Sequence, residues 1–436
     1  MKAIKTLAIT IILLLALALS LPVLIPLERY IPRLASVAAE KLGEPVAIGR
    51  LGLRLLPLPV VTLEDIRIGP QEDVRVGTVR VYPDLWSLAA PVKVLRRVEA
   101  DGVTLDAPLA ERLMRWSRET AGPKTVFVRE VELHNVRLVF GDFQWGPLRA
   151  DLGLDLQGLR RVDAGTEDGS LRVNLVPEGE QYALTLTAYN WTLPVRPALR
   201  FDQLRGQGKL DATQLVLPEL EGRLYGGTLR AASRIGWEDG IRSEGEARTA
   251  GVEIEPIARL LGQVAAVSGQ LYAAGRYRLG AKEAAQLAES LRATFHFEVK
   301  KGVLYNFDLA GAVRSLAREG TRGGQTSFTE LSGTVHLVGK AIELRDIKVA
   351  SGLLAADGNV DIAANRNLSG RLYVKMKGTA GLVSVPLELA GTLREPVLFP
   401  NRAALAGAVV GTGLMGPGLG TTVGAKAGAA LDRLFR

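Results

Sequence analysis

The chain has 436 residues, which is enough for two or three domains or for one extended domain. Apolar residues make up 47% of it, aromatic residues only 6%, and cysteine is absent, which excludes disulfides, thiolate nucleophiles and cysteine-ligated metal ions. The net charge of +8 favours an anionic partner, either nucleic acid or phospholipid headgroups.

The N-terminal segment decides between these two partners. Lys2 and Lys5 precede residues 7–27, which carry no charge, and about 20 apolar residues suffice for a helix that crosses a bilayer. Lysines ahead of the span favour a cytoplasmic N-terminus and export of the remaining chain, which leaves nucleic acid out of reach. The alternative is a signal peptide cleaved near Ser20, although apolar residues continue beyond that point. The predicted anchor residues are Leu7, Ile11, Leu14, Leu17 and Leu21.

Short helices are predicted next. Residues 30–43 place Leu34, Val37 and Leu42 on one helical face, and Gly43 ends the pattern. Residues 108–122, 255–267 and 282–293 have helical spacing too.

Most of the remaining chain alternates between apolar and polar residues, as in strands with one apolar face and one solvent-exposed face. Glycine and Asp or Asn interrupt the strands at short intervals, which is typical of antiparallel hairpins. The pattern predicts roughly 18–22 strands and too few helices to cover them. Either two sheets stack on each other, or one long sheet forms a trough filled by something apolar, and periodicity leaves both open. The clearest alternating segments are 148–157, 182–187, 295–300 and 371–377.

No catalytic, cofactor-binding or metal-binding motif is recognised. His134, His296 and His336 are isolated on strands, and Asp151 and Asp155 lie about 13 Å apart on a strand, beyond glycosidase spacing. Residues 411–416 fit a dinucleotide-binding glycine pattern only formally, because no strand–helix–strand context surrounds them. The sequence therefore predicts a protein that is not an enzyme and has no cofactor.

The tail, by contrast, is distinctive. Residues 403–425 carry no charge, and Gly416, Gly420 and Gly424 recur at a spacing that permits close helix packing in membranes. A membrane-associating helix and a flexible glycine-rich tail are equally consistent with this segment.

Three stretches resemble the AsmA-like family of bacterial envelope proteins, which is related to the TamB and YhdP groups. They are the run from the anchor through residues 40–69, "LEGRLYGGTLRAASRIGW" at 220–237, and residues 300–400 with the closing pattern from Gly391 to Pro396. By this resemblance "KKGVLYNFDLAGAV" at 300–313 is an architectural corner, in which a strand ends at Gly302 and a short helix begins near Asp308 as N-cap.

The resemblance implies four segments. Residues 1–30 form the transmembrane anchor, 31–120 the N-terminal helix-plus-strands region, 121–400 a periplasmic β-groove, and 401–436 the apolar and amphipathic tail. The implied fold is mainly β, with a long curved antiparallel sheet that forms a U-shaped apolar groove and a few short helices.

The implied function is non-enzymatic transfer of phospholipids between the inner and outer membranes by a protein anchored in the inner membrane. The outer membrane or a periplasmic protein would be a further partner. The alternative is an envelope scaffold that assists assembly of outer-membrane proteins and carries no lipid. The predicted groove-lining residues are Leu152, Leu154, Leu184, Leu186, Phe295, Phe297, Val299, Leu372, Val374 and Met376.

Overall fold

The structure is a computed structural model of the full chain. It describes residues 27–106, 126–140, 143–155, 158–195, 197–238, 240–260, 267–282, 286–315, 320–352, 354–378 and 381–401. The predicted anchor residues Leu7, Ile11, Leu14, Leu17 and Leu21, the predicted helix at 108–122 and the tail beyond 401 lie outside these ranges. Within the described ranges, none of the helices has the length and hydropathy that a membrane crossing requires.

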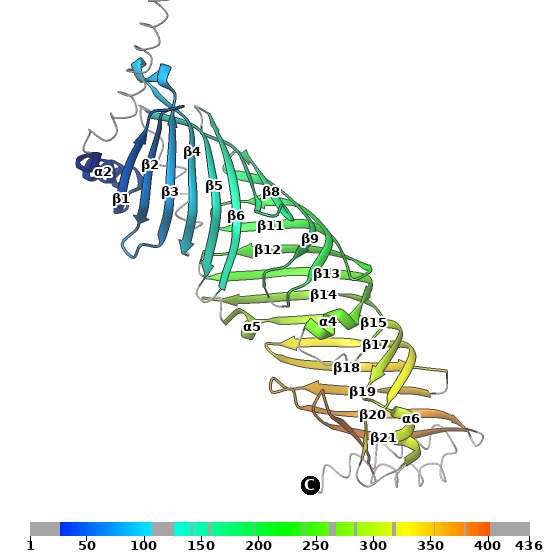
Figure 1. Cartoon of the computed structure of the whole chain (residues 1–436). Helices are drawn as coiled ribbons and strands as arrows, with labels where there is room; N and C mark the ends of the chain where they lie inside the picture. Colours follow the sequence, from blue (N-terminus) through cyan, green and yellow to red (C-terminus); the bar gives the residue numbers. More distant parts are fainter. Residues whose placement is uncertain are drawn as a thin grey trace, which may run out of the picture. The chain divides into compact units, whose positions relative to one another are not determined.

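The described residues form 22 strands of one hydrogen-bonded sheet, with few and short helices (Figure 1). The prediction of a mainly β protein is therefore confirmed. Contacts between residues divide the chain into two compact units. Unit 1 contains Met1–Ala188 and Gln207–Leu215, and unit 2 contains Tyr189–Gly206 and Val216–Arg436.

Unit 1 begins with a 3-10 helix and an α-helix followed by consecutive strands. Pro32 lies in the first turn of the α-helix, and Gly43 ends it in the left-handed conformation (φ 67°), as the sequence predicts. The elements are η1 (Leu27–Tyr30), α2 (Ile31–Leu42), β1 (Val46–Arg54), β2 (Val60–Ile68), β3 (Val74–Pro83), η2 (Leu85–Ala89), β4 (Lys93–Asp106), β5 (Val126–Phe140), β6 (Phe143–Asp155), β7 (Gly158–Thr166), β8 (Leu171–Glu178) and β9 (Gln181–Thr192).

The prediction of a wholly antiparallel sheet is wrong at one pair. β4 and β5 run parallel, whereas the other consecutive pairs from β1 to β9 are antiparallel. A parallel pair needs a long crossover connection, and residues 107–125 separate these two strands in sequence. Parallel and antiparallel strands show the same alternation of apolar and polar residues, so the sequence pattern did not distinguish the two kinds of pairing.

The remaining strands and helices follow in sequence. β15 pairs with β14 on one side and with β17 on the other, and the two-residue β16 pairs with β22. The elements are β10 (Arg200–Leu210), β11 (Gln214–Leu224), β12 (Gly227–Gly236), β13 (Ile241–Glu253), α4 (Ile254–Leu260), β14 (Gln270–Ala281), α5 (Leu287–Ser290), β15 (Arg292–Tyr305), α6 (Leu309–Ser315), β16 (Thr321–Arg322), β17 (Gln325–Val338), β18 (Ala341–Ala350), β19 (Leu354–Ile362), β20 (Leu368–Gly378), β21 (Gly381–Gly391) and β22 (Pro396–Pro400).

The helix predicted at 282–293 is shorter than expected, and of the helix predicted at 255–267 the structure describes residues 255–260 and 267. α4 occupies the start of the predicted 255–267 helix. The predicted helix at 282–293 is wrong at its end, because Arg292 and Ala293 already belong to β15. Ladder hydrogen bonds to β14 and β17 outweigh the local helical preference there.

The corner at residues 300–313 is partly as predicted. Asp308 caps α6, because its Oδ1 accepts a hydrogen bond from the Gly311 N–H (2.7 Å). The prediction that the strand ends at Gly302 is wrong, since β15 continues to Tyr305 and Gly302 pairs with Phe328. Gly302 is needed for space, because a Cβ there would overlap the Ser268 carbonyl oxygen and the Phe328 ring.

In unit 1 the alternation of apolar and polar residues skips one residue at the same level of five neighbouring strands, β1 to β5. Asp65, Gly102 and Asn135 adopt left-handed φ angles of 54°, 68° and 51°, and the register places Gly49 and Gly77 in the same line. We call these five positions the crease. Apolar side chains on the two sides of the crease are therefore separated by an odd number of residues along a strand. Leu51 and Ile48, for example, are three residues apart and both belong to the apolar face.

Each unit has a hydrophobic core. In unit 1 it includes Ile66, Val74, Val76, Val103 and Leu105 on the β2–β3 turn side of the crease and Ala100 on the other side. In unit 2 it extends over β15 and β17–β22 and includes Leu309 and Ala312 of α6.

The tight approach at Gly302 generates a stability prediction. Gly302→Ala should destabilise unit 2 by about 1–3 kcal/mol, because the added methyl overpacks the Phe328 ring. Hydrogen–deuterium exchange of β15 and β17 should accelerate. Gly352→Ala is the matched control, since nothing lies within 4 Å of a Cβ at Gly352; equal exchange in both variants would contradict the prediction.

Candidate functional site

Apolar side chains run without interruption across the nine strands of unit 1. The pairing register joins one residue of each strand to the next from β1 to β9, and every member is Leu or Val. This first apolar row consists of Leu53, Val61, Val81, Val98, Val131, Leu152, Val162, Leu175 and Leu184.

A second apolar row runs beside the first, two residues along each strand. Its members are again joined strand by strand and contain only Leu, Val and Ala. They are Leu51, Leu63, Val79, Ala100, Leu133, Ala150, Ala164, Val173 and Leu186.

Most of these side chains are only half-buried. In the first apolar row Leu184 alone is fully buried, and in the second only Ala100 is. Successive residues of a strand point to opposite faces, so the rows occupy one face, and polar neighbours such as Arg172 and Thr185 occupy the other. Unit 1 therefore presents a broad apolar strip that remains partly open to solvent.

Three of the predicted groove residues lie on this strip, and a fourth lies beside it. Leu152 and Leu184 belong to the first apolar row, and Leu186 belongs to the second. Leu154 pairs with Leu159 after a register shift at Gly153 and is half-buried. The register thus brings together side chains that the sequence could only place strand by strand.

An apolar cleft lies between α2 and the first strands of unit 1. It has a volume of 390 Å³. Its lining is nearly all apolar and includes Leu51, Leu53 and Val61 of the two apolar rows. The remaining lining residues are Leu27, Tyr30, Arg33, Leu34, Val37 and Gly52.

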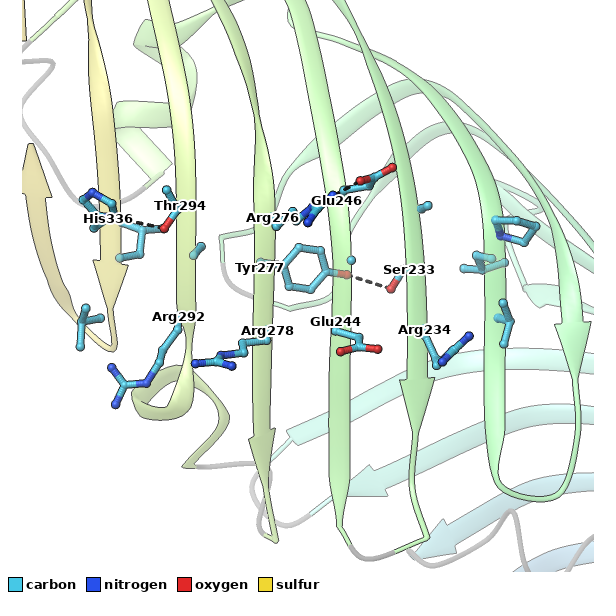
Figure 2. Close-up of a pocket in the computed structure, with 18 residues that line it drawn as sticks. Ser233, Arg234, Glu244, Glu246, Arg276, Tyr277, Arg278, Arg292, Thr294 and His336 are labelled. Atoms are coloured by element: carbon cyan, nitrogen blue, oxygen red, sulfur yellow. Dashed lines mark hydrogen bonds and ion pairs between the residues drawn. The ribbon is translucent and has the colours of Figure 1, made fainter. Parts of the chain in front are cut away.

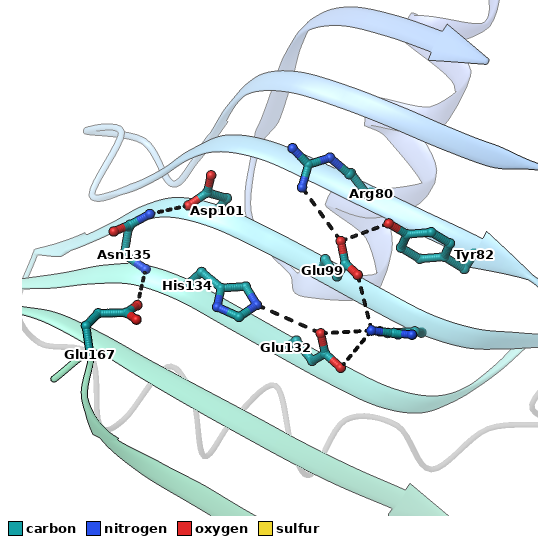
Figure 3. Close-up of polar contacts among 9 residues, drawn as sticks. Arg80, Tyr82, Glu99, Asp101, Glu132, His134, Asn135 and Glu167 are labelled. Atoms are coloured by element: carbon teal, nitrogen blue, oxygen red, sulfur yellow. Dashed lines mark hydrogen bonds and ion pairs between the residues drawn. The ribbon is translucent and has the colours of Figure 1, made fainter. Parts of the chain in front are cut away.

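The polar face of β3–β5 carries a network of ion pairs (Figure 3). Arg97 joins Glu99 (3.4 Å) and Glu132 (3.1 Å), and the Tyr82 hydroxyl donates a hydrogen bond to Glu99 (2.9 Å). The hydrogen bond and charge of Glu132 raise the pKa of Arg97. The two carboxylates are occupied by arginine and tyrosine donors, so the cluster acts as a cross-strand clamp.

The three histidines make local contacts. His134 Nε2 lies 3.8 Å from Glu132, His296 bonds Thr334 (2.9 Å), and His336 bonds Thr294 (3.0 Å). Of the carboxylates considered in the sequence, Asp155 accepts a hydrogen bond from the Gly158 N–H (3.1 Å), and Asp151 lies opposite Asp163 in the strand pairing. The sequence missed the Arg97 cluster because its members are adjacent only through strand pairing.

Unit 2 has a comparable apolar row, but the protein itself covers it. Register joins eight apolar residues from β13 to β21. Six of the eight are buried, and Val252 and Val374 are 0% exposed. Leu309 and Ala312 of α6 pack into the same core. The unit 2 row consists of Val252, Leu271, Val299, Leu331, Val349, Ala356, Val374 and Val385.

The other predicted groove residues lie in unit 2. Val299, Leu372 and Val374 are buried in the core, and Phe297 and Met376 pack against it. Phe295 is half-buried and pairs with Gly275 and Val335. The contact of all six with lipid stays a prediction, whereas the contact of the first five with the protein core is observed.

A hydrogen bond between two polar side chains spans β12–β14 on the face that carries the unit 2 row. Tyr277 and Ser233 share a hydrogen bond of 2.8 Å that passes over Gly245, where a Cβ would lie 2.9 Å from the Tyr277 ring (Figure 2). The apolar face is therefore not uniform in unit 2.

Tyr277 and Ser233 also line an open hollow of 740 Å³ at these strands (Figure 2). The register sets Arg234, Glu244, Arg278 and Arg292 side by side on β12–β15, as Figure 2 shows. Arg278 and Arg292 are direct cross-strand partners, an arrangement that costs stability through like-charge repulsion. The hollow is lined by both basic and acidic side chains, unlike the apolar rows.

The packing of α6 over the unit 2 row generates a stability prediction. Leu309→Ala should cost about 2–5 kcal/mol, because Leu309 is 1% exposed and its removal leaves a cavity above the core. Exchange in β17 and β20 should accelerate, and binding of a fluorescent apolar dye should increase. Arg314→Ala on the exposed side of α6 is the control; the same response in both variants would contradict the role given to Leu309.

The Tyr82–Glu99 contact generates a pH prediction. Burial, followed by the hydrogen bond to Glu99, raises the pKa of Tyr82 above its ordinary value of 10.0. The folded form therefore binds this proton more tightly, and its contribution to stability is lost as pH rises through the raised pKa. An absorbance titration should show one late-ionising tyrosine that disappears in Tyr82→Phe and ionises earlier in Glu99→Gln. An unchanged titration in Tyr82→Phe would contradict the assignment.

Comparison with known proteins locates one similarity. Residues 1–82 match the model of the AsmA family, a segment that includes α2 and β1 to β3 up to Tyr82. No curated protein and no solved structure matches the chain. The resemblance seen in the sequence is thereby supported in its N-terminal part, and residues 1–82 of the chain are AsmA-like.

Proposed function

We propose that this protein is a membrane-anchored carrier that moves phospholipids along the apolar strip of its β-sheet, as part of the bacterial envelope. The single observation that carries the proposal is the pair of unbroken apolar rows in unit 1, which nine strands build and which protein side chains leave half-open. Acyl chains are the occupant that such a strip suits.

The energetics favour acyl chains on this surface. Burying one methylene contributes about 0.8 kcal/mol, so a chain of about 16 carbons gains on the order of 10 kcal/mol before entropy losses. Neighbouring strands lie about 4.8 Å apart and offer nearly equivalent Leu and Val contacts. A lipid could therefore step from strand to strand with little change in free energy.

The proposed transport is passive and involves no chemical step. Its driving force would be the difference in lipid chemical potential between donor and acceptor. The anchor predicted at residues 7–27 would hold the protein in the inner membrane with its bulk in the periplasm, and the apolar strip would form the wall of a U-shaped groove. The outer membrane or a periplasmic protein would receive the lipid.

A second candidate function rests on unit 2. Its apolar row is packed beneath Leu309 and Ala312, so this part of the sheet is satisfied by protein alone. That observation favours an envelope scaffold that supports assembly of outer-membrane proteins without carrying lipid. The two functions differ in what contacts the unit 1 rows in the cell.

Site-specific photo-crosslinking separates the two functions. A photoreactive phenylalanine analogue placed at Val173 or Leu186, in the second apolar row, should form adducts with phospholipid in cells. The same analogue at Arg172 or Thr185 is the matched control, because these neighbours point to the polar face of the same strands. Mass spectrometry of the purified adducts identifies the lipid.

The scaffold would give a different result. Protein adducts without lipid at Val173 and Leu186 would exclude the carrier and favour the scaffold. Lipid adducts of equal yield on both faces would exclude specific carriage, since a bound acyl chain contacts one face only.

A further inference from the structure

Large apolar side chains are exposed together at one end of the unit 1 sheet. The β1–β2 turn holds Leu58, and the β3–β4 connection holds Leu85, Trp86 and Val92, while Val126 begins β5. Trp86 is 92% exposed, and Leu58 and Leu85 exceed half exposure. Exposed apolar side chains gathered at one end of a sheet are typical of an interaction surface.

Topology places these residues at the same end. β1 ends where β2 begins, because Arg54 pairs with Val60, and β3 ends where β4 begins, because Pro83 pairs with Leu95. The parallel pairing of Lys93 with Val126 brings the start of β5 to the same edge. We call Leu58, Leu85, Trp86, Val92 and Val126 the apolar tip.

The backbone holds Trp86 outward. Its N–H donates to Asp84 Oδ1 (3.1 Å), the Ser87 hydroxyl donates to the Asp84 carbonyl (2.7 Å), and the Val94 N–H donates to Ser87 Oγ (2.8 Å). Ser87 is buried, so the two bonds of its hydroxyl are partly shielded from water. The turn is thus pre-organised with the indole in solvent, which is costly for a surface that nothing covers.

Charge at the tip is mainly basic. Residues 51–63 and 83–96 contain Arg54, Lys93 and Arg96 against the single acid Asp84. The opposite end of the sheet differs, since the β2–β3 turn at 69–73 is polar and carries an ion pair between Arg67 and Glu72 (3.1 Å). Of these two described ends of the sheet, the tip is the one that combines exposed apolar side chains with basic residues.

The chain also enters the unit at this end. Leu27 lines the cleft beside Leu53 and Val61, which lie in the strand ends that the β1–β2 turn joins. The segment that ends at Leu27 is the uncharged stretch that predicts the membrane anchor. The tip therefore lies next to the point where the anchor would leave the bilayer.

We propose that the apolar tip inserts into the headgroup–acyl boundary of the same bilayer that holds the anchor. Tryptophan favours this boundary because its ring is amphipathic, and basic residues favour anionic headgroups. The proposal rests on the anchoring part of the proposed function and adds a second membrane contact, independent of lipid carriage. Such a contact would bring the β1–β5 part of the first apolar row close to the membrane as a site of lipid entry.

Depth measurement with a fluorescent probe tests this directly. The chain contains no cysteine, so the full-length variants Leu85→Cys and Leu58→Cys can each carry one environment-sensitive label. The variants would be reconstituted into vesicles of phosphatidylcholine and phosphatidylglycerol that contain nitroxide-labelled lipids. Gln71→Cys, in the exposed β2–β3 turn at the other end of the sheet, is the control.

At Leu85 and Leu58 the emission should shift to the blue and be quenched by lipids with a nitroxide near the headgroup. At Gln71 it should match that of the label in water. Labels at Leu85 and Leu58 that behave like the label at Gln71, in protein that resists extraction from the vesicles, would overturn the proposal. The crosslinking test of lipid carriage would be unaffected by that outcome, so failure of the tip and failure of the carrier are distinguishable.

Discussion

A β-sheet with one apolar face has to shield that face from water, and the rest of this structure depends on how that need is met. Unit 2 meets it with its own residues, because α6 and the last strands pack Leu309 and Ala312 over a row that reaches 0% exposure at Val374. Unit 1 meets it only in part, since most members of its two apolar rows stay half-buried. The partial shielding in unit 1 is the physical basis for proposing an apolar ligand there.

The continuity of the unit 1 rows depends on strand register. A slip of one residue would turn every apolar side chain of a strand to the polar face. At the crease, left-handed Asp65, Gly102 and Asn135 shift the pattern by one residue in neighbouring strands at once, so the apolar face survives the shift. The clamp of Arg97 with Glu99 and Glu132 on the other face joins β4 and β5, the pair that runs parallel.

Local features of the chain were predictable because they depend on neighbours in sequence. Alternation identified the strands that hold Leu152, Leu184 and Leu372, Gly43 marked the end of α2, and Asp308 marked the start of α6. The role of Gly302 was not predictable, because its constraint comes from Phe328, 26 residues away, rather than from a turn. The exposed Trp86 acquires meaning only beside Leu58 and Val126, which strand pairing brings to the same edge.

The sequence by itself determined the class of this protein: a mainly β chain with one apolar face per strand, short helices and an N-terminal segment of the AsmA type. Those properties follow from side-chain periodicity and local backbone preference, which act within a few residues. Only the tertiary structure decided which apolar residues stay open and which are covered. Val162 and Val374 have the same chemistry and the same alternating surroundings, yet one is half-buried and the other is sealed in a core. Burial depends on long-range packing, such as that of α6 in unit 2, and no local pattern encodes it.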